Sequence, residues 1–520
     1  MSERQAGGDE GLAGNGADNR GASHPANLGT HRGAQSGTHS GESRGAHLES
    51  KSRGGREGIS RRRFWQTAVA GSAAGGAAAA WLMGPGGRVE ASGNEASAEG
   101  ATGSGRIGKG VRDPLLETTN PVIAKGRDAG LEVLKPTAAQ LEQGLEIHRR
   151  ALVFDFYGFA PRAALDADRL LAAAEAGASE AEWQDLVEEE SMTRAVRDAA
   201  ERDELAEALL CSGVTAVFQN AGEEGQDPLR LMKRLARFTW LTDNLPELLG
   251  RATQPAHLRA AREQNRACLY LTGNGVPLPQ QWVSVEEELG YVRLFHQLGI
   301  RMMHVTYNRR NMLGDGCAEV ANGGLSDLGR RAIAEMNAVG VIVDVAHSGL
   351  RTSLEAARAS QRPMVASHTT CAAVNPHIRA KSDEVLKAIA ETGGVVGLAW
   401  IAPFLGGTGD LAALLDHIDY AIKTVGIDHV AVGSDVSHTS QHAAAAQRKL
   451  PARPRGRVRY EALWPEGALG GVWPRAASLA WTNWPLLTVG LVQRGYSEEA
   501  IRKVLGENAV RVCEANWKHS

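Results

Sequence analysis

The sequence predicts an α/β fold, a parallel (β/α)8 barrel with helical insertions in its loops, and three observations support this prediction. Eight short, almost continuously apolar runs follow one another downstream of residue 146. Segments with the 3.6-residue apolar period of an amphipathic helix separate them. No G-x-G-x-x-G motif follows the first run, which argues against a dinucleotide-binding open sheet. Apolar strands that alternate with helices are typical of parallel strands covered on both faces, and eight such units favour a closed barrel.

The predicted strands are all short and rich in apolar or β-branched residues. In chain order they are Leu152–Phe156, Val214–Phe218, Cys268–Thr272, Arg301–Thr306, Val341–Ala346, Met364–Ser367, Val395–Trp400 and His429–Ser434. The clearest helix between them places its apolar face on 328–339, where Ser326 can cap the start and Gly340 can end it. Further helices are predicted at 385–389 and 411–425.

Composition limits the kind of protein this chain can be. Its 520 residues include 43% hydrophobic residues, enough for a large core, so a wholly disordered chain is excluded. The 57 basic and 60 acidic residues give a formal net charge of −3, and we therefore expect no nucleic-acid partner. The five cysteines are scattered and none forms a C-x-x-C pair, which argues against a disulfide scaffold, a zinc ribbon and a thioredoxin-like redox site.

The amino end has the composition of a targeting segment. Residues 1–58 are mostly Gly, Ser, His, Asn, Arg and Glu, and we predict a disordered tail. Residues 59–91 contain Ser-Arg-Arg-Arg-Phe-Trp at positions 60–65, followed by a weakly apolar Ala/Gly stretch. This pattern resembles a twin-arginine export signal, with an ordinary membrane anchor as the alternative. We expect cleavage near Ala91 or retention as an anchor, and a periplasmic or membrane-attached protein facing the periplasm.

The remaining chain divides into a connecting segment and one large domain. Residues 92–145 read as a Gly/Ser linker followed by a segment that docks onto the domain, and residues 146–515 form the predicted barrel. Helical insertions are expected at 161–210 and 223–262, and a basic excursion rich in Pro, Arg and Trp at 440–480.

Polar side chains follow several predicted strands at their carboxyl ends, where barrels of this kind carry their chemistry. His347 and His368 follow two neighbouring strands, and Asp435 follows the last one. Two neutral imidazoles can share one zinc ion, a carboxylate can take a proton from an activated water, and Arg379 can bind a substrate carboxylate. A single histidine after an apolar strand is more often a core residue, but the combination favours metal-assisted hydrolysis of a small acidic-ended molecule.

Other histidines are given structural roles by the same argument. His304 lies inside its predicted strand and not at the end, and we interpret it as structural. His377, His429 and His438 are expected near the rim of the barrel, in loop or packing positions. Cys371 has no base at a recognisable spacing and is expected to be an inert thiol.

A series of motifs follows in order along residues 146–515. They are Gly299-Ile300-Arg301 to Asn308, Gly314-Asp315-Gly316-Cys317-Ala318-Glu319, Gly324 to Gly329, Glu335-Met336-Asn337, Val343 to His347, Pro363 to His368, Gly393 to Gly397, Arg494 to Glu499 and Leu505 to Arg511. Together these motifs resemble the membrane (renal-type) dipeptidase family of metallopeptidases. The resemblance implies a TIM-type barrel of the metal-dependent hydrolase kind, in which two zinc ions hydrolyse dipeptides, including some with a D-residue at the carboxyl side.

The resemblance also assigns roles to individual positions. His347 and His368 match the two histidine ligands of one zinc ion, and Asp435 matches the aspartate that handles protons at the scissile amide. Arg379 matches the first member of an Arg-Asn pair that binds the substrate carboxylate, although Ala380 stands in place of the Asn.

Several positions that hold the second zinc ion in the family carry residues that are poor ligands or no ligands at all. Where the family has Asp-Gly-His-Asn-Asp, this chain has Tyr157 and Phe159 in place of the two ligands. The segment 271–275 offers no carboxylate where the family places a bridging glutamate. Tyr307 replaces the family's substrate-side histidine, so we assign it to substrate binding.

Three hypotheses follow from this pattern. The preferred one is an exported hydrolase of dipeptides or related small amides with one zinc ion, on His347 and His368, with Asp435 left open as a third ligand. The second is an inactive barrel of the same family that binds a small ligand or a cell-wall peptide. The third, which we place last, recruits ligands from Glu223-Glu224 or from 286–288. A small dipeptide-like substrate is the expected partner, and membrane attachment through the amino end and homo-oligomerisation are left open.

Overall fold

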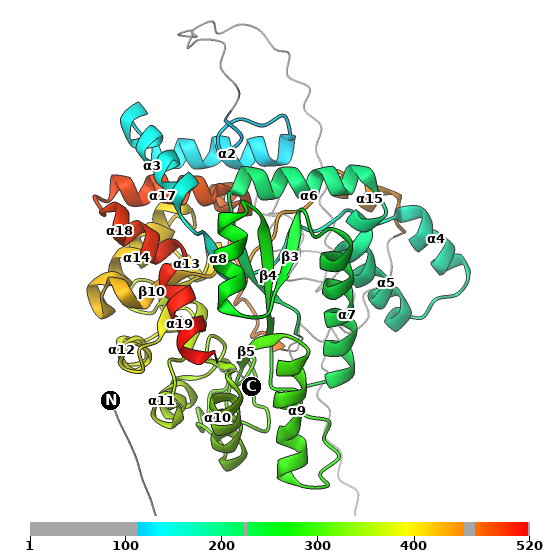
Figure 1. Ribbon diagram of the computed structural model, residues 1–520, viewed down its shortest axis with the longest axis vertical. Helices are drawn as coiled ribbons and strands as arrows, with labels where there is room; N and C mark the ends of the chain where they lie inside the picture. The colour runs from blue at the N-terminus through cyan, green and yellow to red at the C-terminus, as the bar shows by residue number, and fades with distance from the viewer. Residues whose placement is uncertain (1–112, 223–225, 452–462, 518–520) are drawn as a thin grey trace, which may run out of the picture. The chain divides into compact units, whose positions relative to one another are not determined.

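The eight predicted strands all form, and they are parallel neighbours in a single sheet that curls into a barrel (Figure 1). In order around the sheet they are β1 (Phe154–Gly158), β2 (Ala216–Asn220), β4 (Ala267–Gly273), β5 (Ile300–His304), β6 (Ile342–Asp344), β7 (Val365–Cys371), β9 (Val395–Leu398) and β10 (Val430–Val432). Two short strands that the sequence did not indicate pair at the sides, β3 (Leu249–Ala252) with β4 and β8 (Ala380–Lys381) with β7.

The computed structural model describes residues 113–222, 226–451 and 463–517. The predicted tail at 1–58 and the predicted export signal at 59–91 therefore lie outside the described residues. Within the described part of the chain, no helix combines the length and the hydrophobicity that a membrane crossing requires.

The barrel closes between β1 and the segment that follows β10. The backbone N–H of Asp435 donates to the carbonyl of Tyr157 at 2.9 Å. The buried Asp155 carboxylate accepts from the N–H of Ser434 at 2.8 Å, from its hydroxyl at 2.6 Å and from the indole N–H of Trp481 at 3.0 Å. Burial raises the pKa of Asp155 to about 7, and these hydrogen bonds act in the opposite direction. Asp155 thus holds the first and last strands together.

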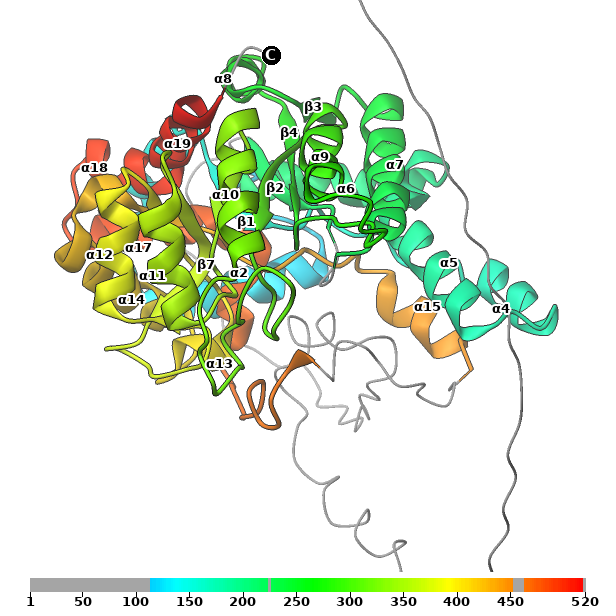
Figure 2. The ribbon, with the colours of Figure 1, turned by 90° about the horizontal axis from the view of Figure 1, so that it is seen from below.

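Helices cover the outside of the barrel and join successive strands. The described helices are α2 (Pro121–Leu134), α3 (Ala138–Arg150), α4 (Ala167–Glu175), α5 (Glu180–Thr193), α6 (Ala199–Ser212), α7 (Pro228–Asn244), α8 (Pro255–Glu263), α9 (Val285–Gln297), α10 (Asp327–Val339), α11 (Leu350–Ala359), α12 (Asp383–Glu391), α13 (Ala402–Leu405), α14 (Leu411–Val425), α15 (Ala443–Lys449), α17 (Trp484–Gln493), α18 (Glu498–Arg502) and α19 (Asn508–Asn516). Figure 2 shows α10, α11 and α12 standing around the strands, and successive members of this series pack against each other.

Local sequence signals account for the helix ends. The Ser326 side chain accepts from the N–H of Gly329 at the start of α10, and Gly340 ends this helix in the left-handed region at φ 90°. The helix predicted at 411–425 forms as α14, where Asp410 caps the first turn. The helix predicted around 385–389 is α12.

The insertions form mainly helices. Residues 161–210 contain α4, α5 and most of α6, and Figure 1 shows α4 and α5 at one side of the barrel near α7. Residues 223–262 contain α7, β3 and most of α8. In the excursion at 440–480, α15 is described, whereas residues 452–462 lie outside the described residues.

Two helices before β1 pack on the barrel. Helix α3 lies against α17, and at Gly144 the contact leaves no room for a side chain, because a Cβ atom there would lie 2.6 Å from Val489 Cγ2 and 2.7 Å from Val489 Cα. The His148 ring contacts Thr488 Oγ1 at 2.8 Å and the carbonyl of Ser212 at 2.9 Å. The segment from 121 to 150 is therefore part of the folded domain.

A pair of glycine substitutions tests this packing. We expect Gly144→Ala to destabilise the protein by about 1–3 kcal/mol, because the added methyl group meets the α17 backbone. Gly290 lies in α9 with nothing within 4 Å of its added Cβ, so Gly290→Ala should stabilise by up to about 1 kcal/mol through helix propensity. Chemical denaturation of the two variants measures both effects. Equal stabilisation by the two would show that α3 does not depend on contact with α17.

Candidate metal centre

The two histidines predicted as ligands meet at the mouth of the barrel. His347 follows β6 and His368 lies in β7, and both side chains are almost completely buried. Their Nε2 atoms are 2.9 Å apart. The Nδ1 atom of His347 lies 2.7 Å from Asn308 Oδ1, and that of His368 lies 2.8 Å from Ser367 Oγ.

The hydrogen bonds on the Nδ1 side fix which ring nitrogen carries the proton. The Ser367 hydroxyl donates its only proton to Asp344 Oδ2, so it accepts from the Nδ1–H group of His368. Asn308 Oδ1 accepts from the Nδ1–H group of His347 and also from the thiol of Cys317. Both Nε2 atoms therefore present lone pairs to each other at 2.9 Å, which is unfavourable unless a cation lies between them. The donor set fits a divalent metal ion.

The electrostatics of the mouth keep both imidazoles neutral. Burial lowers the pKa of His347 and of His368 well below the usual value, and the nearby positive charge of Arg379 lowers both further. A neutral imidazole is the form that binds a metal ion.

A further histidine and an aspartate belong to the same cluster. His304 ends β5 and Asp344 ends β6, and both are fully buried. His304, Asp344 and His368 each have a potential ligand atom within 4.8 Å of the other two. The sequence led us to interpret His304 as structural, but its ring centroid lies 5.2 Å from that of His347 and 5.4 Å from that of His368.

Aromatic side chains occupy the space beside the two imidazoles. Tyr157 stacks on His368 with ring centroids 3.7 Å apart, and its hydroxyl donates to Asn274 Oδ1. Tyr307 stacks on His347 at 4.0 Å. Thus Tyr157, at a position where a family ligand is lost, and Tyr307, predicted to bind substrate, each lie against one of the two histidines. Phe159 meets the Tyr157 ring edge to face at 6.2 Å.

The guanidinium of Arg379 lies beside the histidines with one nitrogen unused. Its Nη2 donates to the carbonyl of His368 at 2.8 Å, and its face lies 5.2 Å from the ring centroid of Phe404 and 6.0 Å from that of Trp464. Arg379 is fully buried, yet its Nη1 atom has no hydrogen-bond partner among the described residues. A buried, unpaired guanidinium nitrogen is suited to a carboxylate ligand.

Asp435 has the properties of a group that exchanges protons. It follows β10, is 8% exposed and adopts the left-handed region at φ 57°. Burial raises the pKa of its carboxyl to about 7, and the positive charge of Arg379 moderates the increase. Such a carboxyl can accept and return a proton near neutral pH.

The shifted pKa of Asp435 predicts a pH dependence of stability in metal-free protein. The carboxyl has a pKa of about 7 when folded and the ordinary value of 3.8 when unfolded, so its contribution to stability is complete below about pH 4 and is lost as the pH rises through 7. Between about pH 5 and pH 8, the free energy of unfolding should fall by about 2–3 kcal/mol more in wild type than in Asp435→Asn. If the free energy of unfolding changed with pH in the same way in wild type and in Asp435→Asn, the raised pKa of Asp435 would be wrong.

Two of the glutamates considered as replacement ligands, Glu286 and Glu288, have other partners in the structure. Glu286 pairs with Arg331 on the protein surface, and Glu288 accepts from the backbone N–H groups of Gln280 and Trp282. Glu223 and Glu224 lie outside the described residues. The three rim histidines have partners of their own, since His377 contacts the carbonyl of Ala468, His429 that of Gly394 and His438 the carboxylate of Glu204.

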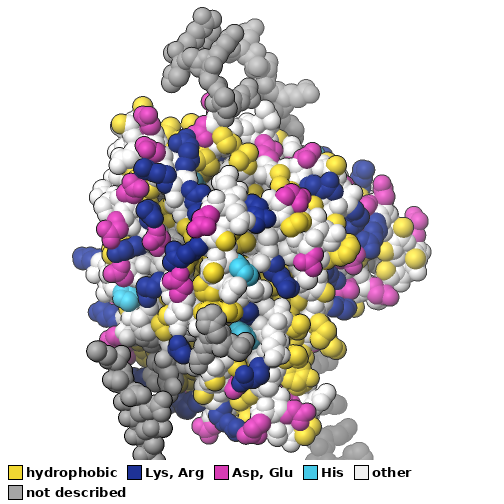
Figure 3. Space-filling view, in the orientation of Figure 1, with side chains coloured by type: hydrophobic (Ala, Val, Ile, Leu, Met, Phe, Trp, Pro, Cys, Tyr) yellow, Lys and Arg dark blue, Asp and Glu magenta, His cyan; other side chains and the backbone are white. Residues whose placement is uncertain are grey.

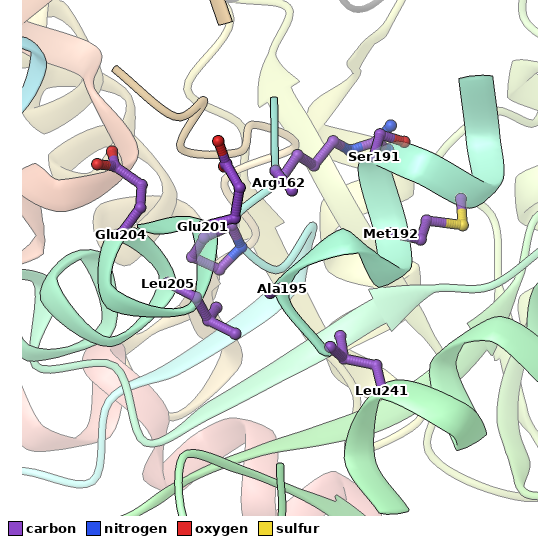
Figure 4. A pocket seen from close by; sticks show the side chains of 10 residues that line it. Arg162, Ser191, Met192, Ala195, Glu201, Glu204, Leu205 and Leu241 are labelled. Atoms are coloured by element: carbon purple, nitrogen blue, oxygen red, sulfur yellow. The ribbon is translucent and has the colours of Figure 1, made fainter. Parts of the chain in front are cut away.

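A separate small cavity, lined by none of these residues, lies among α5, α6 and α7. Figure 4 shows Arg162, Glu201 and Glu204 around it, and its volume is about 10 Å³, room for one water molecule. Glu204 already accepts from Asn120 and Gln441. This cavity is too small for a dipeptide. Figure 3 shows basic and acidic side chains intermingled on the face that it displays.

Several neighbours of the predicted site residues were not singled out from the sequence. Asn308, Asp344 and Ser367 orient the histidines, and Trp464 covers the Arg379 guanidinium. The first three stand within three residues of Tyr307, His347 or His368 at strand ends, and that proximity is a signal by which they could have been found.

Sequence comparison places these observations in a family. A family model described as membrane dipeptidase (Peptidase family M19) matches residues 178–446, more than half of the chain. The chain is 27% identical over 230 residues to the dipeptidase verJ of Clonostachys rogersoniana, covering 44% of this chain and 51% of that protein. It is 33% identical over 150 residues to the dipeptidase aclJ of Aspergillus oryzae, covering 28% of this chain and 36% of that protein. The chain therefore spans about half or less of the length of these curated relatives.

Solved structures show the same fold. An amidohydrolase from Pseudomonas aeruginosa superimposes with a TM-score of 0.52 at 27% identity, over 72% of this chain and 99% of that one. The probable dipeptidase PvdM from the same organism superimposes with a TM-score of 0.51 at 19% identity, over 73% of this chain and 98% of that one. Fold and site together define a (β/α)8 barrel of the metal-dependent hydrolase kind. The chain belongs to the membrane dipeptidase family, Peptidase family M19.

Proposed function

We propose that this protein hydrolyses dipeptides or related small amides with a single zinc ion held by His347 and His368. The observation that carries the proposal is the pair of Nε2 atoms facing each other at 2.9 Å with both Nδ1 protons engaged elsewhere. Membership of a dipeptidase family and the names of its relatives support the substrate class. The phenol of Tyr157 and the ring of Phe159, at positions of the second zinc site, favour one ion over two.

The residues around the histidines define how a dipeptide would be handled. The unpaired Nη1 of Arg379 would bind the substrate carboxylate, and the rings of Phe404 and Trp464 keep that guanidinium out of water. Asp435, with a pKa near 7, would take a proton from the attacking water and deliver it to the leaving amine. The zinc ion would supply Lewis-acid activation of the water and the scissile carbonyl.

Metal removal tests this function. Purified wild-type protein should carry about one zinc ion per chain, and a chelator should abolish hydrolysis of a panel of dipeptides. Stoichiometric zinc should restore the activity, because the ligands are fixed by the barrel. A metal-free preparation that remains inert across the panel after zinc is added would overturn the proposal.

A second candidate function is binding without hydrolysis. Tyr157 and Tyr307 stack on the two imidazoles and occupy space beside them, which is the specific observation in its favour. Under this alternative, calorimetry would detect dipeptide binding that Arg379 governs, whereas no product would form at any zinc concentration.

We also propose that the protein is exported through the twin-arginine route. The support is the run of arginines at 61–63 followed by Phe64, Trp65 and an Ala/Gly-rich stretch. A folded, metal-loaded enzyme is the kind of cargo that this route carries. Fractionation of cells that express the chain tests this export. The control is a variant in which Arg61, Arg62 and Arg63 are replaced by lysine.

A further inference from the structure

We infer that His304 is a third nitrogen ligand of the metal ion, completing with His347 and His368 a three-histidine site that differs from the ligand set that the family resemblance implies. The inference rests on the proposed metal-dependent function and specifies the ligands of that same site. It assigns a role to a residue that the sequence analysis placed inside the predicted strand Arg301–Thr306 and interpreted as structural, but that is the last residue of β5.

The first observation is that one nitrogen of the buried His304 imidazole has no partner. The side chain is fully buried, and its Nε2 atom lies 2.7 Å from Asp344 Oδ2. Its Nδ1 atom has no hydrogen-bond partner among the described residues. Buried polar groups in native proteins are normally satisfied, and an unpartnered imidazole nitrogen next to two other imidazoles is explained by a shared cation.

The second observation is the arrangement of the three rings. Their centroids form a nearly equilateral triangle, with 5.2 Å from His304 to His347, 5.4 Å from His304 to His368 and 4.9 Å from His347 to His368. Three imidazoles that bind one zinc ion tetrahedrally, with Zn–N bonds of about 2.0–2.1 Å, have ring centroids roughly 5 Å apart. The barrel thus already spaces the rings as one ion requires.

The third observation concerns Asp344, which supports the site from outside. Its Oδ1 atom accepts from the N–H groups of Ala346 at 2.9 Å and Ser367 at 3.0 Å, and its Oδ2 atom accepts from the Ser367 hydroxyl. With His304 beside Oδ2, the lone-pair positions of the carboxylate are filled. Asp344 is therefore the acceptor behind His304, in the way that carboxylates orient zinc-bound histidines, and His304 Nδ1 is left for the ion.

The resulting ligand set accounts for the loss of the family's other ligands. Three protein ligands with one open position are the composition of a catalytic zinc site. His304 would supply the third donor, which neither Tyr157 nor the segment 271–275 can provide. The three ligands come from β5, β7 and the loop after β6, three adjacent positions around the barrel.

The test uses the full-length chain loaded with zinc. X-ray absorption at the zinc edge of wild-type protein should show three imidazoles in the first coordination shell. Zinc affinity can be measured by competition with a chromophoric chelator. In His304→Leu it should fall by more than the ~10–100-fold loss that is typical when a residue outside the first coordination shell is replaced. Asp344→Asn should fall within that range, and His429→Gln, a histidine bonded to the Gly394 carbonyl, should leave affinity unchanged.

The outcomes separate the inference from the proposed function. Two imidazoles in the wild-type absorption spectrum, or wild-type zinc affinity in His304→Leu, would overturn the inference even if the enzyme hydrolyses dipeptides. Three imidazoles in a protein that hydrolyses nothing would support the inference and defeat the proposed function. Because the absorption spectrum is recorded on wild type, the test remains decisive if His304→Leu fails to fold.

Discussion

Replacing His368 by alanine should remove the bound zinc and reduce dipeptide hydrolysis by roughly 10³-fold or more. The reason is that the Nε2 atom of His368 faces that of His347 at 2.9 Å, and the ligands that remain without His368 are too few for the three that a catalytic zinc site uses. A metal ion contributes several kcal/mol of transition-state stabilisation, and each 1.4 kcal/mol is a factor of about ten in rate. Zinc content by elemental analysis and kcat/KM for a dipeptide measure the two effects.

The control for this variant is the same substitution at a buried histidine whose two ring nitrogens both have hydrogen-bond partners. His417 contacts the N–H of Cys371 at 3.1 Å and the carbonyl of Leu405 at 3.0 Å, away from the cluster. His417→Ala should cost stability while leaving one zinc ion per chain. If His368→Ala retained both zinc and activity, the metal would have to be bound elsewhere, and the proposed site would be wrong.

Replacing Arg379 by methionine should lower kcat/KM for a dipeptide by about 30- to 1000-fold, equivalent to about 2–4 kcal/mol of lost transition-state binding. Methionine keeps an unbranched apolar stem against Phe404 and Trp464 but removes the charge and the unpaired Nη1 donor. Zinc content should be unchanged, because the Arg379 guanidinium donates to the backbone carbonyls of Ala346 and His368 and not to an imidazole nitrogen.

The matched control for Arg379→Met is a second substrate, tested on both wild type and the variant. A dipeptide amide lacks the carboxylate that Arg379 would bind, so wild type should hydrolyse it slowly and the substitution should change that rate little. A loss that is equally large for the acid and the amide would show that Arg379 supports the fold of the mouth and does not bind substrate.

The fold could be predicted from the sequence because a parallel strand that is buried on both faces consists of consecutive apolar residues, which are recognisable in the sequence. Each of the eight predicted runs overlaps a barrel strand, and the cap and stop of α10 are at Ser326 and Gly340 as expected. The short strands β3 and β8 were missed because they are only four and two residues long and carry no distinct pattern. Helices α2 and α3 precede the first strand, and only packing against α17 shows that they belong to the domain.

The site was predictable in part because strand ends are visible in the sequence. His347 and Asp435 follow the ends of β6 and β10, where a barrel gathers its reactive groups, whereas His368 lies within β7, which continues to Cys371 beyond the predicted end at Ser367. His304 was interpreted as structural because it lies within a run, and alternation along a strand does not reveal which side chains point into the barrel and how near they come to another strand's residues. The partners of Asp155 were not predictable either, since Ser434 and Trp481 are hundreds of residues away along the chain.

The most direct test of this account is a crystal structure of the zinc-loaded protein with anomalous diffraction recorded at the zinc edge. The account predicts one strong peak per chain within about 2.0–2.1 Å of the Nε2 atoms of both His347 and His368. No peak there, with the two rings joined by a direct hydrogen bond in zinc-treated crystals, would contradict it.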